Sequence, residues 1–168
     1  MILNAEQILE QGLILLDNAK GKPAQVGYDL SIKEVNKVGG EIGMVLKDKT
    51  IVNKHTPVEK TSLEGKKGWI LYQGVYDVIM NEGCDIHPDR VGLVRQRSSL
   101  MRNGAIITSS IFDPGFKTAN VGTYMIVFET IFIEEDARVA QMYFHECEPV
   151  SQDQLYNGQF QNDKWRNR

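Results

Sequence analysis

Two arginines, five positions apart, enclose two neighbouring serines in the middle of the sequence: Arg97, Ser98, Ser99 and Arg102. A guanidinium group is a planar fork that matches pairs of phosphate oxygens, and a serine hydroxyl adds a compact donor. The run follows a strand expected to end near Arg95, so backbone N–H groups leaving that strand add further donors. The pattern suits a polyphosphate cradle, and the alternative is a set of solvated side chains at a strand end.

A carboxylate follows in a short hairpin that is otherwise mostly apolar. Asp113 stands before the turn Pro114-Gly115, and the hairpin also carries Ser109 and Ser110. A carboxylate at such a tip can orient a water molecule or accept a proton from a sugar hydroxyl. The alternative is an aspartate that only caps the Pro-Gly bend. The closeness of Asp113 to the arginine–serine run favours the chemical role.

The elements that must position these side chains are mainly strands. Asn4 and Gln7 form a capping pattern for one short helix, which Gly12 is expected to end. Beyond the helix, runs of period two separated by Gly, Asn and Asp predict a series of strands. These cover residues 13–16, 27–32, 69–71, 75–80, 91–95, 105–108, 124–131 and 139–145. Many short strands and one helix predict an all-β sandwich or barrel.

Two polar stretches are expected to be surface segments. Residues 47–67 are lysine-rich and predict a loop, and residues 151–168 form a tail rich in Gln and Asn with isolated aromatic side chains. The tail is either a frayed terminus or a segment that orders over a ligand or a neighbouring subunit. Because no repeat and no linker pattern is visible, residues 1–150 are expected to form a single β domain.

Composition narrows the class of partner and the compartment. A formal net charge of -3 argues against duplex nucleic acid, because such binding depends on a broad basic surface. Two cysteines without a CxxC pattern, with only three histidines, predict neither a disulfide framework nor a zinc site. The sequence has no secretory signal pattern and no run of about 18 apolar residues, so a cytoplasmic protein without a membrane segment is expected.

Five short motifs occur in one order along nearly the whole chain. They are Gly27-Tyr28-Asp29-Leu30, then Arg97-Ser98-Ser99-Leu100 with Arg102 and Gly104, then Asp113-Pro114-Gly115-Phe116, then Ala137-Arg138-Val139-Ala140-Gln141, and finally Tyr156-Asn157-Gly158-Gln159-Phe160-Gln161. This order resembles the dUTP diphosphatase and dCTP deaminase superfamily. The stretch 76–141 is most similar to archaeal-type dUTP diphosphatases, and the last motif resembles the tail of the deaminase-like branch.

The resemblance implies a distorted, jelly-roll-like β-barrel with one short N-terminal helix, assembled as a homotrimer with its sites between subunits. The ligand would be a pyrimidine deoxynucleoside triphosphate. By resemblance, its phosphates would be held by Arg97, Ser98, Ser99, Arg102 and Gln141, and its base would be read along the hairpin containing Ser109 and Ser110. Asp113 would contact the 3'-hydroxyl and position water, and Phe116 would stack beneath the sugar. Asp29 would approach a Mg²⁺ ion through water, and the ligand would be covered by Tyr156, Gln159, Phe160 and Gln161.

The reaction depends on the position of one glutamate. A dUTP diphosphatase directs water at the α-phosphorus and releases dUMP and pyrophosphate, whereas a dCTP deaminase needs a glutamate at the base. The deaminase pattern places this residue about five positions after a glycine. Counted from Gly122, that position holds Val127, and Glu129 comes two residues later. Strand alternation keeps these two on one face, so Glu129 is either an inward catalytic group or a polar residue at a strand end.

The predicted activity is therefore dUTP diphosphatase, and the short step from Arg102 to Asp113 also favours it. The alternatives are a dCTP deaminase, including a bifunctional one, and a non-catalytic nucleotide-binding regulator or structural trimer of the same fold. Retention of the charged cradle argues against the non-catalytic readings. Two features depart from the family pattern: a longer run, residues 117–121, precedes Gly122, and the glycine-rich C-terminal arm of ordinary trimeric diphosphatases is missing.

Overall fold

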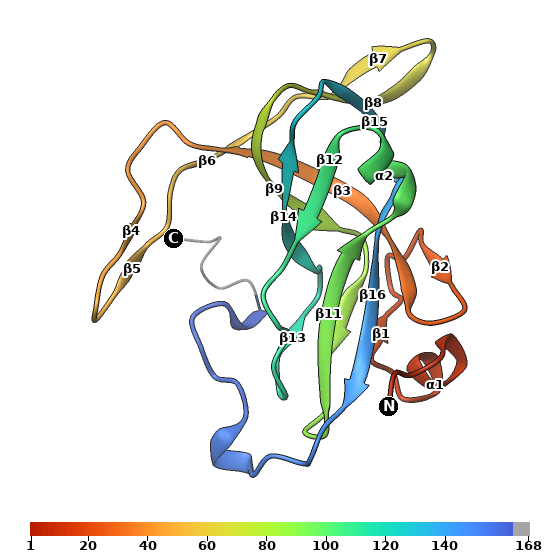
Figure 1. Ribbon diagram of the computed structural model, residues 1–168, viewed down its shortest axis with the longest axis vertical. Coiled ribbons are helices and arrows are strands. Elements are labelled where there is room, and N and C mark those ends of the chain that lie inside the picture. Colours follow the sequence, from red (N-terminus) through yellow and green to blue (C-terminus); the bar gives the residue numbers. More distant parts are fainter. Residues whose placement is uncertain (163–168) are drawn as a thin grey trace.

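The computed structural model describes residues 1–162 and consists mainly of strands (Figure 1). Its helices are α1 (Ala5–Glu10), α2 (Ser98–Arg102) and the short 3-10 helix η1 (Gln152–Gln154). Its strands are β1 (Ile14–Leu15), β2 (Lys22–Pro23), β3 (Tyr28–Val38), β4 (Met44–Val45), β5 (Thr50–Ile51), β6 (His55–Pro57), β7 (Thr61–Leu63), β8 (Lys66–Leu71), β9 (Gly74–Met80), β10 (Gly83–Asp85), β11 (Arg90–Gln96), β12 (Ala105–Thr108), β13 (Lys117–Thr118), β14 (Gly122–Val127), β15 (Ile131–Glu134) and β16 (Arg138–Glu146).

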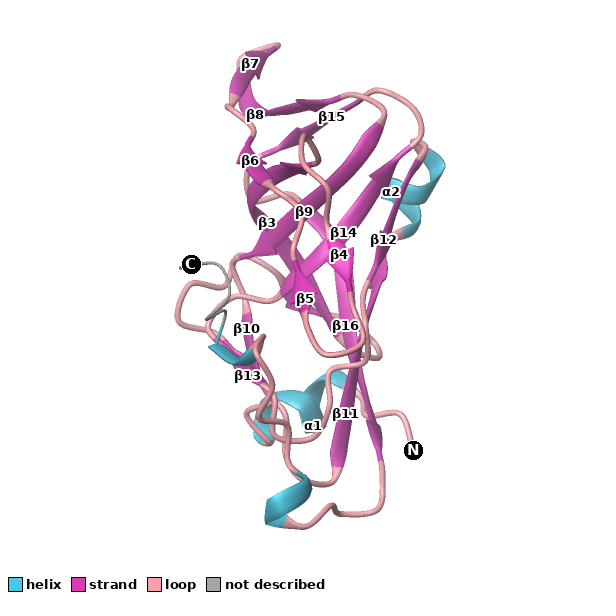
Figure 2. Ribbon diagram, turned by 90° about the vertical axis from the view of Figure 1, so that its left-hand side faces the viewer, coloured by secondary structure: helices cyan, strands magenta, loops and turns pink. Residues whose placement is uncertain are grey.

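The main sheet runs in the order β11-β16-β3-β9-β14-β12, with β2 and β6 also paired to β3. The long strand β3 pairs with β16 along its first half and with β9 along its second half, and irregular register separates the two halves. At the far edges, Gly92 of β11 and Phe112 exchange two backbone hydrogen bonds of 2.9 Å. These bonds join the two ends of the sheet, so the predicted all-β barrel is confirmed in a nearly closed form (Figure 2).

The barrel is filled by side chains that alternate along its strands. In β14 and in most of β16, every second residue is buried, which is the pattern expected of strands with one face on a core. The largest fully buried side chains include Trp69, Phe144, Leu30, Ile32 and Met125. They come from β8, β16, β3 and β14, so strands far apart in the sequence share one apolar cluster.

The predicted N-terminal helix is confirmed together with its capping pattern. The Asn4 side chain accepts a hydrogen bond from Gln7 N at 2.9 Å, and the Gln7 side chain accepts one from Asn4 N at 3.0 Å. Gly12 follows the helix with a φ of +64°, a conformation that glycine adopts without steric cost. Among the helices that the structure describes, none has the length and apolar character needed to cross a membrane.

The prediction of one strand over residues 124–131 is wrong at its C-terminal end. β14 ends at Val127, and β15 begins at Ile131. The backbone N–H groups of Phe128 and Glu129 both donate to the carbonyl oxygen of Gly104, at 2.8 and 3.3 Å. These bonds turn the chain out of the sheet, and the alternation argument that placed Glu129 on the face of Val127 therefore does not apply.

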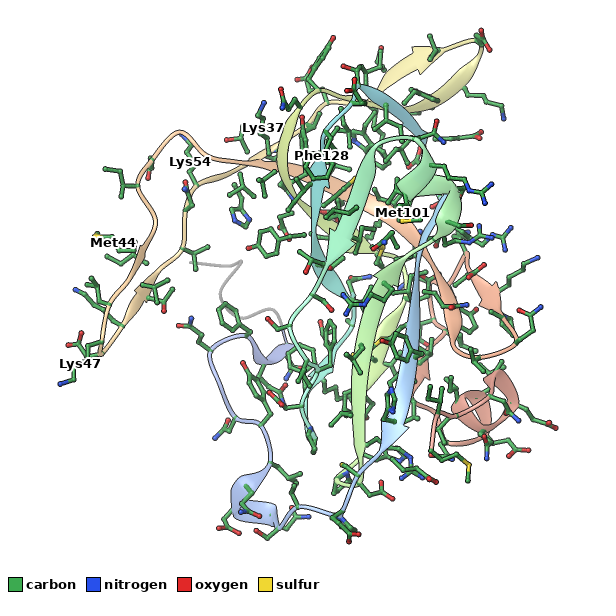
Figure 3. All side chains as sticks on the ribbon, in the orientation of Figure 1. Lys37, Met44, Lys47, Lys54, Met101 and Phe128 are labelled. Atoms are coloured by element: carbon green, nitrogen blue, oxygen red, sulfur yellow. The ribbon has the colours of Figure 1, made fainter. Side chains whose placement is uncertain are left out.

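The prediction of a loop over residues 47–67 is also wrong. This stretch contains β5, β6 and β7 and the start of β8, which pair with β4, β3 and β15 or with one another. Strands β4 and β5 form a narrow arm that projects from the barrel and carries Met44 and Lys47 (Figure 3). Helix α2 was likewise not predicted, because a single turn of five residues leaves no periodic pattern in the sequence.

Candidate functional site

A row of polar side chains crosses three neighbouring strands of the main sheet. In the antiparallel register, Asp29 of β3 lies opposite Gln141 of β16 on one side and opposite Lys22 of β2 on the other. Residues directly opposite in an antiparallel pair project to the same face of the sheet. The strand register therefore places Lys22, Asp29 and Gln141 side by side on one face.

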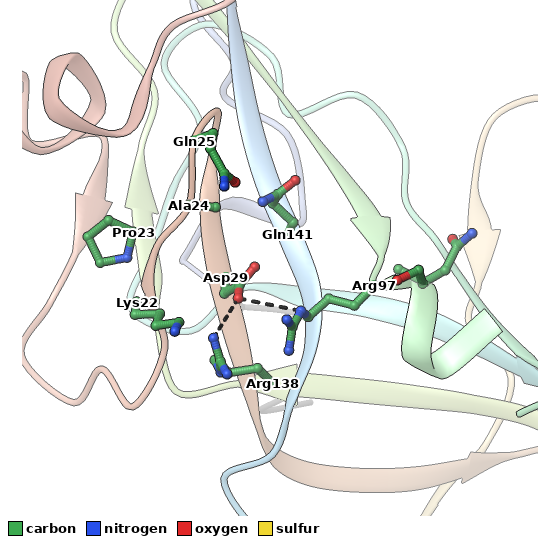
Figure 4. Close-up of a pocket in the computed structure, with 10 residues that line it drawn as sticks. Lys22, Pro23, Ala24, Gln25, Asp29, Arg97, Arg138 and Gln141 are labelled. Atoms are coloured by element: carbon green, nitrogen blue, oxygen red, sulfur yellow. Dashed lines mark hydrogen bonds and ion pairs between the residues drawn. The ribbon is translucent and has the colours of Figure 1, made fainter. Parts of the chain in front are cut away.

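Two arginines converge on the carboxylate at the centre of this row (Figure 4). Arg138 Nη1 donates to Asp29 Oδ2 at 2.9 Å, and Arg97 Nε lies 3.4 Å from the same oxygen. Asp29 is buried, with 5% of its surface exposed, while both arginine side chains remain about one-third exposed. The Arg97 backbone is itself fixed, because its N–H donates to Val139 O of β16 at 2.9 Å.

The cavity in front of this cluster has a volume of about 610 Å³ and is called the cationic cavity here. Its polar lining consists of Lys22, Gln25, Asp29, Gln96, Arg97, Ser98, Arg138 and Gln141. Three cationic groups face one carboxylate, which leaves a net charge of +2 and donors aimed at open space. Arginine forks together with Ser98 and three amide side chains are suited to a ligand with several phosphate oxygens. The cavity brings together four predicted site residues: Asp29, Arg97, Ser98 and Gln141.

A second cavity, the hairpin cavity, has a volume of about 420 Å³ and lies at the loop between β12 and β14. Its lining includes six predicted site residues: Ser109, Ser110, Asp113, Phe116, Tyr156 and Phe160. The Phe116 ring meets the rings of Phe112 and Tyr156 edge to face, each at a centroid distance of 5.4 Å. Such edge-to-face contacts fix the orientation of an aromatic ring. Aromatic rings beside hydroxyls and a carboxylate suit a sugar and a base.

The C-terminal segment packs on the turn that carries Asp113. Gln161 Nε2 donates to Gly115 O at 2.8 Å, and Gln161 Oε1 accepts from Lys117 N at 2.9 Å. One amide side chain therefore pairs with the backbone on both sides of Phe116. In addition, Tyr156 N donates to Pro114 O at 2.8 Å. The described part of the tail therefore lies against the turn that carries Asp113.

A hydrogen-bonded pair of side chains lies behind the hairpin cavity. Asp77 of β9 is fully buried and lines this cavity, and its Oδ2 lies 3.1 Å from His55 Nδ1. Both residues also line a third cavity, of about 610 Å³, on the side of the β4–β5 arm. The structure places Gln159 on this third cavity. Gln159 was predicted to cover the ligand together with Tyr156, Phe160 and Gln161, and of these four residues Tyr156 and Phe160 line the hairpin cavity.

Among the described residues, four predicted site residues line none of the three cavities: Ser99, Arg102, Glu129 and Gln161. Of these, Gln161 still contacts the turn beside the hairpin cavity through its two hydrogen bonds. Ser99 and Arg102 are exposed on α2. Glu129 is exposed beyond the end of β14 that pairs with Ala105, whereas Asp113 follows the opposite end of β12. The length of β12, roughly 10 Å, separates these ends.

Sequence reasoning missed several lining residues. Arg138 stood inside a recognised motif, and its position in that motif was a usable signal. It is the first residue of β16, the strand that pairs with β3 at Asp29. Asp77 was a single carboxylate in an apolar strand, a pattern that indicates a special role when the strand is central. Lys22 carried no signal, because only the pairing of β2 with β3 brings it to the cavity.

Titration of the residue next to Asp29 adds no second negative charge to the site. Burial, and secondly the charge of Glu82, raise the pKa of the Tyr28 phenol above its usual value. A raised pKa keeps this phenol neutral at physiological pH. The charge of the cationic cavity is therefore set by Asp29 and the three cationic side chains alone among its lining residues.

Comparison with known proteins agrees with this geometry. A family model described as dCTP deaminase-like matches residues 3–147. The probable deoxyuridine 5'-triphosphate nucleotidohydrolase of Methanosarcina mazei is 30% identical and covers 89% of this chain and 88% of its own. The deoxyuridine 5'-triphosphate nucleotidohydrolase of Methanocaldococcus jannaschii is 34% identical and covers 75% of this chain and 80% of its own.

A solved structure supports the fold. The crystal structure of 2'-deoxycytidine 5'-triphosphate deaminase from Agrobacterium tumefaciens superposes with a TM-score of 0.63 at 15% identity. The match covers 89% of this chain, which spans about half, 50%, of the length of that protein. The chain belongs to the dCTP deaminase-like family, within the superfamily of dUTP diphosphatases and dCTP deaminases.

Proposed function

We propose that the protein is a dUTP diphosphatase that hydrolyses dUTP to dUMP and pyrophosphate. The similarity to archaeal proteins with the name deoxyuridine 5'-triphosphate nucleotidohydrolase supports this activity over most of the chain. The observation that carries the proposal is the cationic cavity, in which Arg97, Arg138 and Gln141 present donors suited to a chain of phosphates. The exposed position of Glu129, at the opposite end of β12 from Asp113, favours the diphosphatase over the deaminase.

In the proposed reaction, a water oxygen forms a bond to the α-phosphorus while the bond from that phosphorus to the α–β bridging oxygen breaks. The electron pair of the broken bond leaves with pyrophosphate, and the water loses its proton. Asp113 orients this water and accepts the proton, while it also contacts the 3'-hydroxyl. Arg97 and Arg138 stabilise the negative charge that develops on the phosphates. Catalysis of this kind depends mostly on positioning and on electrostatic stabilisation.

The site is proposed to lie between subunits of a homotrimer. Among the described residues, the cationic cavity and the hairpin cavity of one chain have no lining residue in common. The first holds the cations, and the second holds Asp113 and the aromatic rings. A hairpin cavity of one subunit facing a cationic cavity of the next would bring both halves onto one nucleotide. Arg102 and Ser99, exposed on α2, would then reach the ligand from the outer side of this joint site.

Magnesium is proposed only as an ion that arrives with the triphosphate. Among the described residues, no group of three or more His, Cys, Asp or Glu could hold a metal ion. Asp29, the predicted contact, is already paired with two arginines. These residues do not fit a resident metal, so the protein's share would be limited to Asp29 acting through a water molecule. Nucleotide hydrolysis of this kind also fits the cytoplasmic location that the sequence predicts.

The test is to incubate the protein separately with dUTP and dCTP and to separate the products by chromatography. Formation of dUMP and pyrophosphate from dUTP, with dCTP unchanged, is the expected result. Formation of dUTP from dCTP would replace the proposal with a deaminase, and dUMP from dCTP would make the enzyme bifunctional. Absence of any product, with no thermal shift on adding either nucleotide, would overturn the enzymatic proposal. A thermal shift without product would favour a regulator.

A further inference from the structure

A buried carboxylate outside the proposed reaction holds the turn that leads into β2. Glu82 is fully buried just after β9 and accepts four hydrogen bonds. Its Oε1 accepts from Lys20 N at 2.9 Å, Gly21 N at 2.7 Å and Ser31 Oγ at 2.8 Å. Its Oε2 accepts from Ser31 N at 2.8 Å. A buried carboxylate is costly unless its oxygens are satisfied, and here two successive backbone amides help to satisfy it.

The same turn is pressed against the strand that carries Asp29. A Cβ atom on Gly21 would lie 1.8 Å from Asp29 O, a distance that no side chain can occupy. Only glycine therefore allows the chain to pass so close to β3 at this point. Because Lys22 follows directly and pairs with Asp29, the carboxylate of Glu82 and the close approach of Gly21 together fix the position of the Lys22 backbone.

Lys22 changes the charge of the cationic cavity more than its exposed position suggests. Arg97 and Arg138 share the carboxylate of Asp29, so these three side chains carry a net charge of +1. Lys22 raises the net charge to +2 on the same face of the sheet (Figure 4). A lysine ammonium group is a flexible point charge on a long stem, so a fixed backbone position decides which oxygens it can reach.

We propose that Lys22 is a third cationic ligand of the triphosphate and that Glu82 is the positioning residue that holds Lys22 at the cavity. This inference rests on the proposed function, because it assumes that the cationic cavity holds the phosphates. Glu82 acts through the backbone of Lys20 and Gly21 and does not touch the ligand. Lys22 supplies the positive charge, and Glu82 fixes the backbone position from which that charge reaches the phosphates.

The first experiment measures binding of inorganic tripolyphosphate and of dUMP by titration calorimetry, with the wild-type protein and Lys22→Met. Methionine keeps much of the length of the side chain and removes its charge. Tripolyphosphate binding is expected to weaken about tenfold, the effect of losing one charge-assisted contact, while dUMP binding changes less than about twofold. Lys47→Met, at the tip of the β4–β5 arm, is the control for overall charge and should leave both affinities unchanged. Equal losses for the two ligands, or no loss, would overturn the assignment of Lys22.

The second experiment tests whether Glu82 acts through Lys22, with a double-mutant cycle of Glu82→Gln and Lys22→Met. If Glu82 positions Lys22, Glu82→Gln weakens tripolyphosphate binding, and adding Lys22→Met to it costs little more. Additive losses would show that the two residues act separately and would overturn the positioning role. If Glu82→Gln does not fold, Ser31→Ala takes its place in the cycle, because it removes one donor to Glu82 Oε1 and, besides that, only the acceptor of Asn81 Nδ2.

A kinetic readout separates this inference from the proposed function. Lys22→Met is expected to raise KM for dUTP about tenfold and to change kcat less than about threefold, as for a contact present in both ground and transition state. If dUTP turnover persists and neither constant changes, the inference fails while the diphosphatase stands. If the wild-type protein neither turns over dUTP nor binds tripolyphosphate, the proposed function itself fails.

Discussion

The cationic cavity is centred on hydrogen-bonded strands, whereas the hairpin cavity combines one side formed by β9 and β14 with a second side formed by a loop, a turn and the C-terminal segment. In the first, the register of β2, β3 and β16 places Lys22, Asp29 and Gln141 in one row. In the second, edge-to-face rings and the two hydrogen bonds of Gln161 hold the loop, the turn and the C-terminal segment together. Strand register holds side chains more rigidly than a loop does, because a shift of one residue would turn every side chain to the other face. We therefore expect the side chains proposed to bind the phosphates to be held more rigidly than the side chains proposed to cover the sugar and base.

The strongest test of this division is the substitution Asp113→Asn in the hairpin cavity. We expect kcat for dUTP to fall about 1,000-fold, within the range for loss of a general base, because the amide cannot accept the proton of water. Tripolyphosphate affinity should stay within about twofold, since the cationic cavity is intact. Pyrophosphate release measures the first quantity and calorimetry the second. Full activity would remove Asp113 from its role, and Asp48→Asn on the arm serves as the control.

The arginine of β16 inside the cationic cavity and the exposed arginine of α2 should respond differently to the same substitution. Arg138→Met removes a 2.9 Å contact to Asp29 from the cationic cavity and should weaken tripolyphosphate binding by roughly 10- to 100-fold. Arg102→Met, outside that cavity, should leave tripolyphosphate binding within about twofold and lower dUTP turnover about tenfold through the joint site. For both variants, titration calorimetry measures the affinity for tripolyphosphate, and steady-state kinetics measures the turnover of dUTP. Equal losses of tripolyphosphate affinity would place Arg102 in the cradle, as the sequence predicts.

Two glutamines in the tail offer a matched pair for the hairpin cavity. Gln161→Ala loses both hydrogen bonds to the backbone beside Phe116 and should raise KM for dUTP about fivefold, the effect of about 1 kcal/mol. Gln159→Ala, two residues away on the third cavity, should change KM less than about twofold. The measurement is steady-state kinetics at several dUTP concentrations. A larger effect at Gln159 would restore its predicted contact with the ligand.

The smallest effect is expected at Glu129. Because this side chain is exposed beyond β14, Glu129→Gln should leave dUTP hydrolysis within about twofold of wild type. The same variant should leave the product pattern with dCTP unchanged. Loss of a dCTP-derived product in this variant alone would show that Glu129 serves a deaminase reaction at a neighbouring subunit.

Prediction from the sequence succeeded where the pattern involved neighbouring residues or where a motif lay on a regular strand. The capping pattern of Asn4 and Gln7 concerns neighbouring residues, and it holds in the structure. Asp29, Arg97 and Gln141 were named from separate motifs and meet in one cavity, because each motif lies on a regular strand or at its end. The alternating burial along β14 and most of β16 likewise agrees with the period-two pattern from which these strands were predicted.

The failures follow partly from contacts between distant segments and partly from an overlooked turn. The short strand β6 forms because it pairs with β3, far away in the sequence. Strand β7 instead pairs with β8 across the tight turn Glu64-Gly65, a local hairpin signal within residues 47–67. The bend after Val127 depends on the carbonyl of Gly104, which the local alternation of the strand does not reveal.

The double hydrogen bond between Gly92 and Phe112 has an evolutionary consequence. It ties the start of the Asp113 turn to β11, the strand whose other end leads into Arg97. The chain between Asp113 and Gly122 lies beyond this tie and includes β13, which pairs with β10 and has Thr118 buried. A change of length outside β13 would therefore leave the register of β11 unchanged. Surface loops tolerate such changes in length far better than strands do. The part of the chain proposed to contact the sugar and base could therefore vary between relatives while the strands that position Arg97 stay the same.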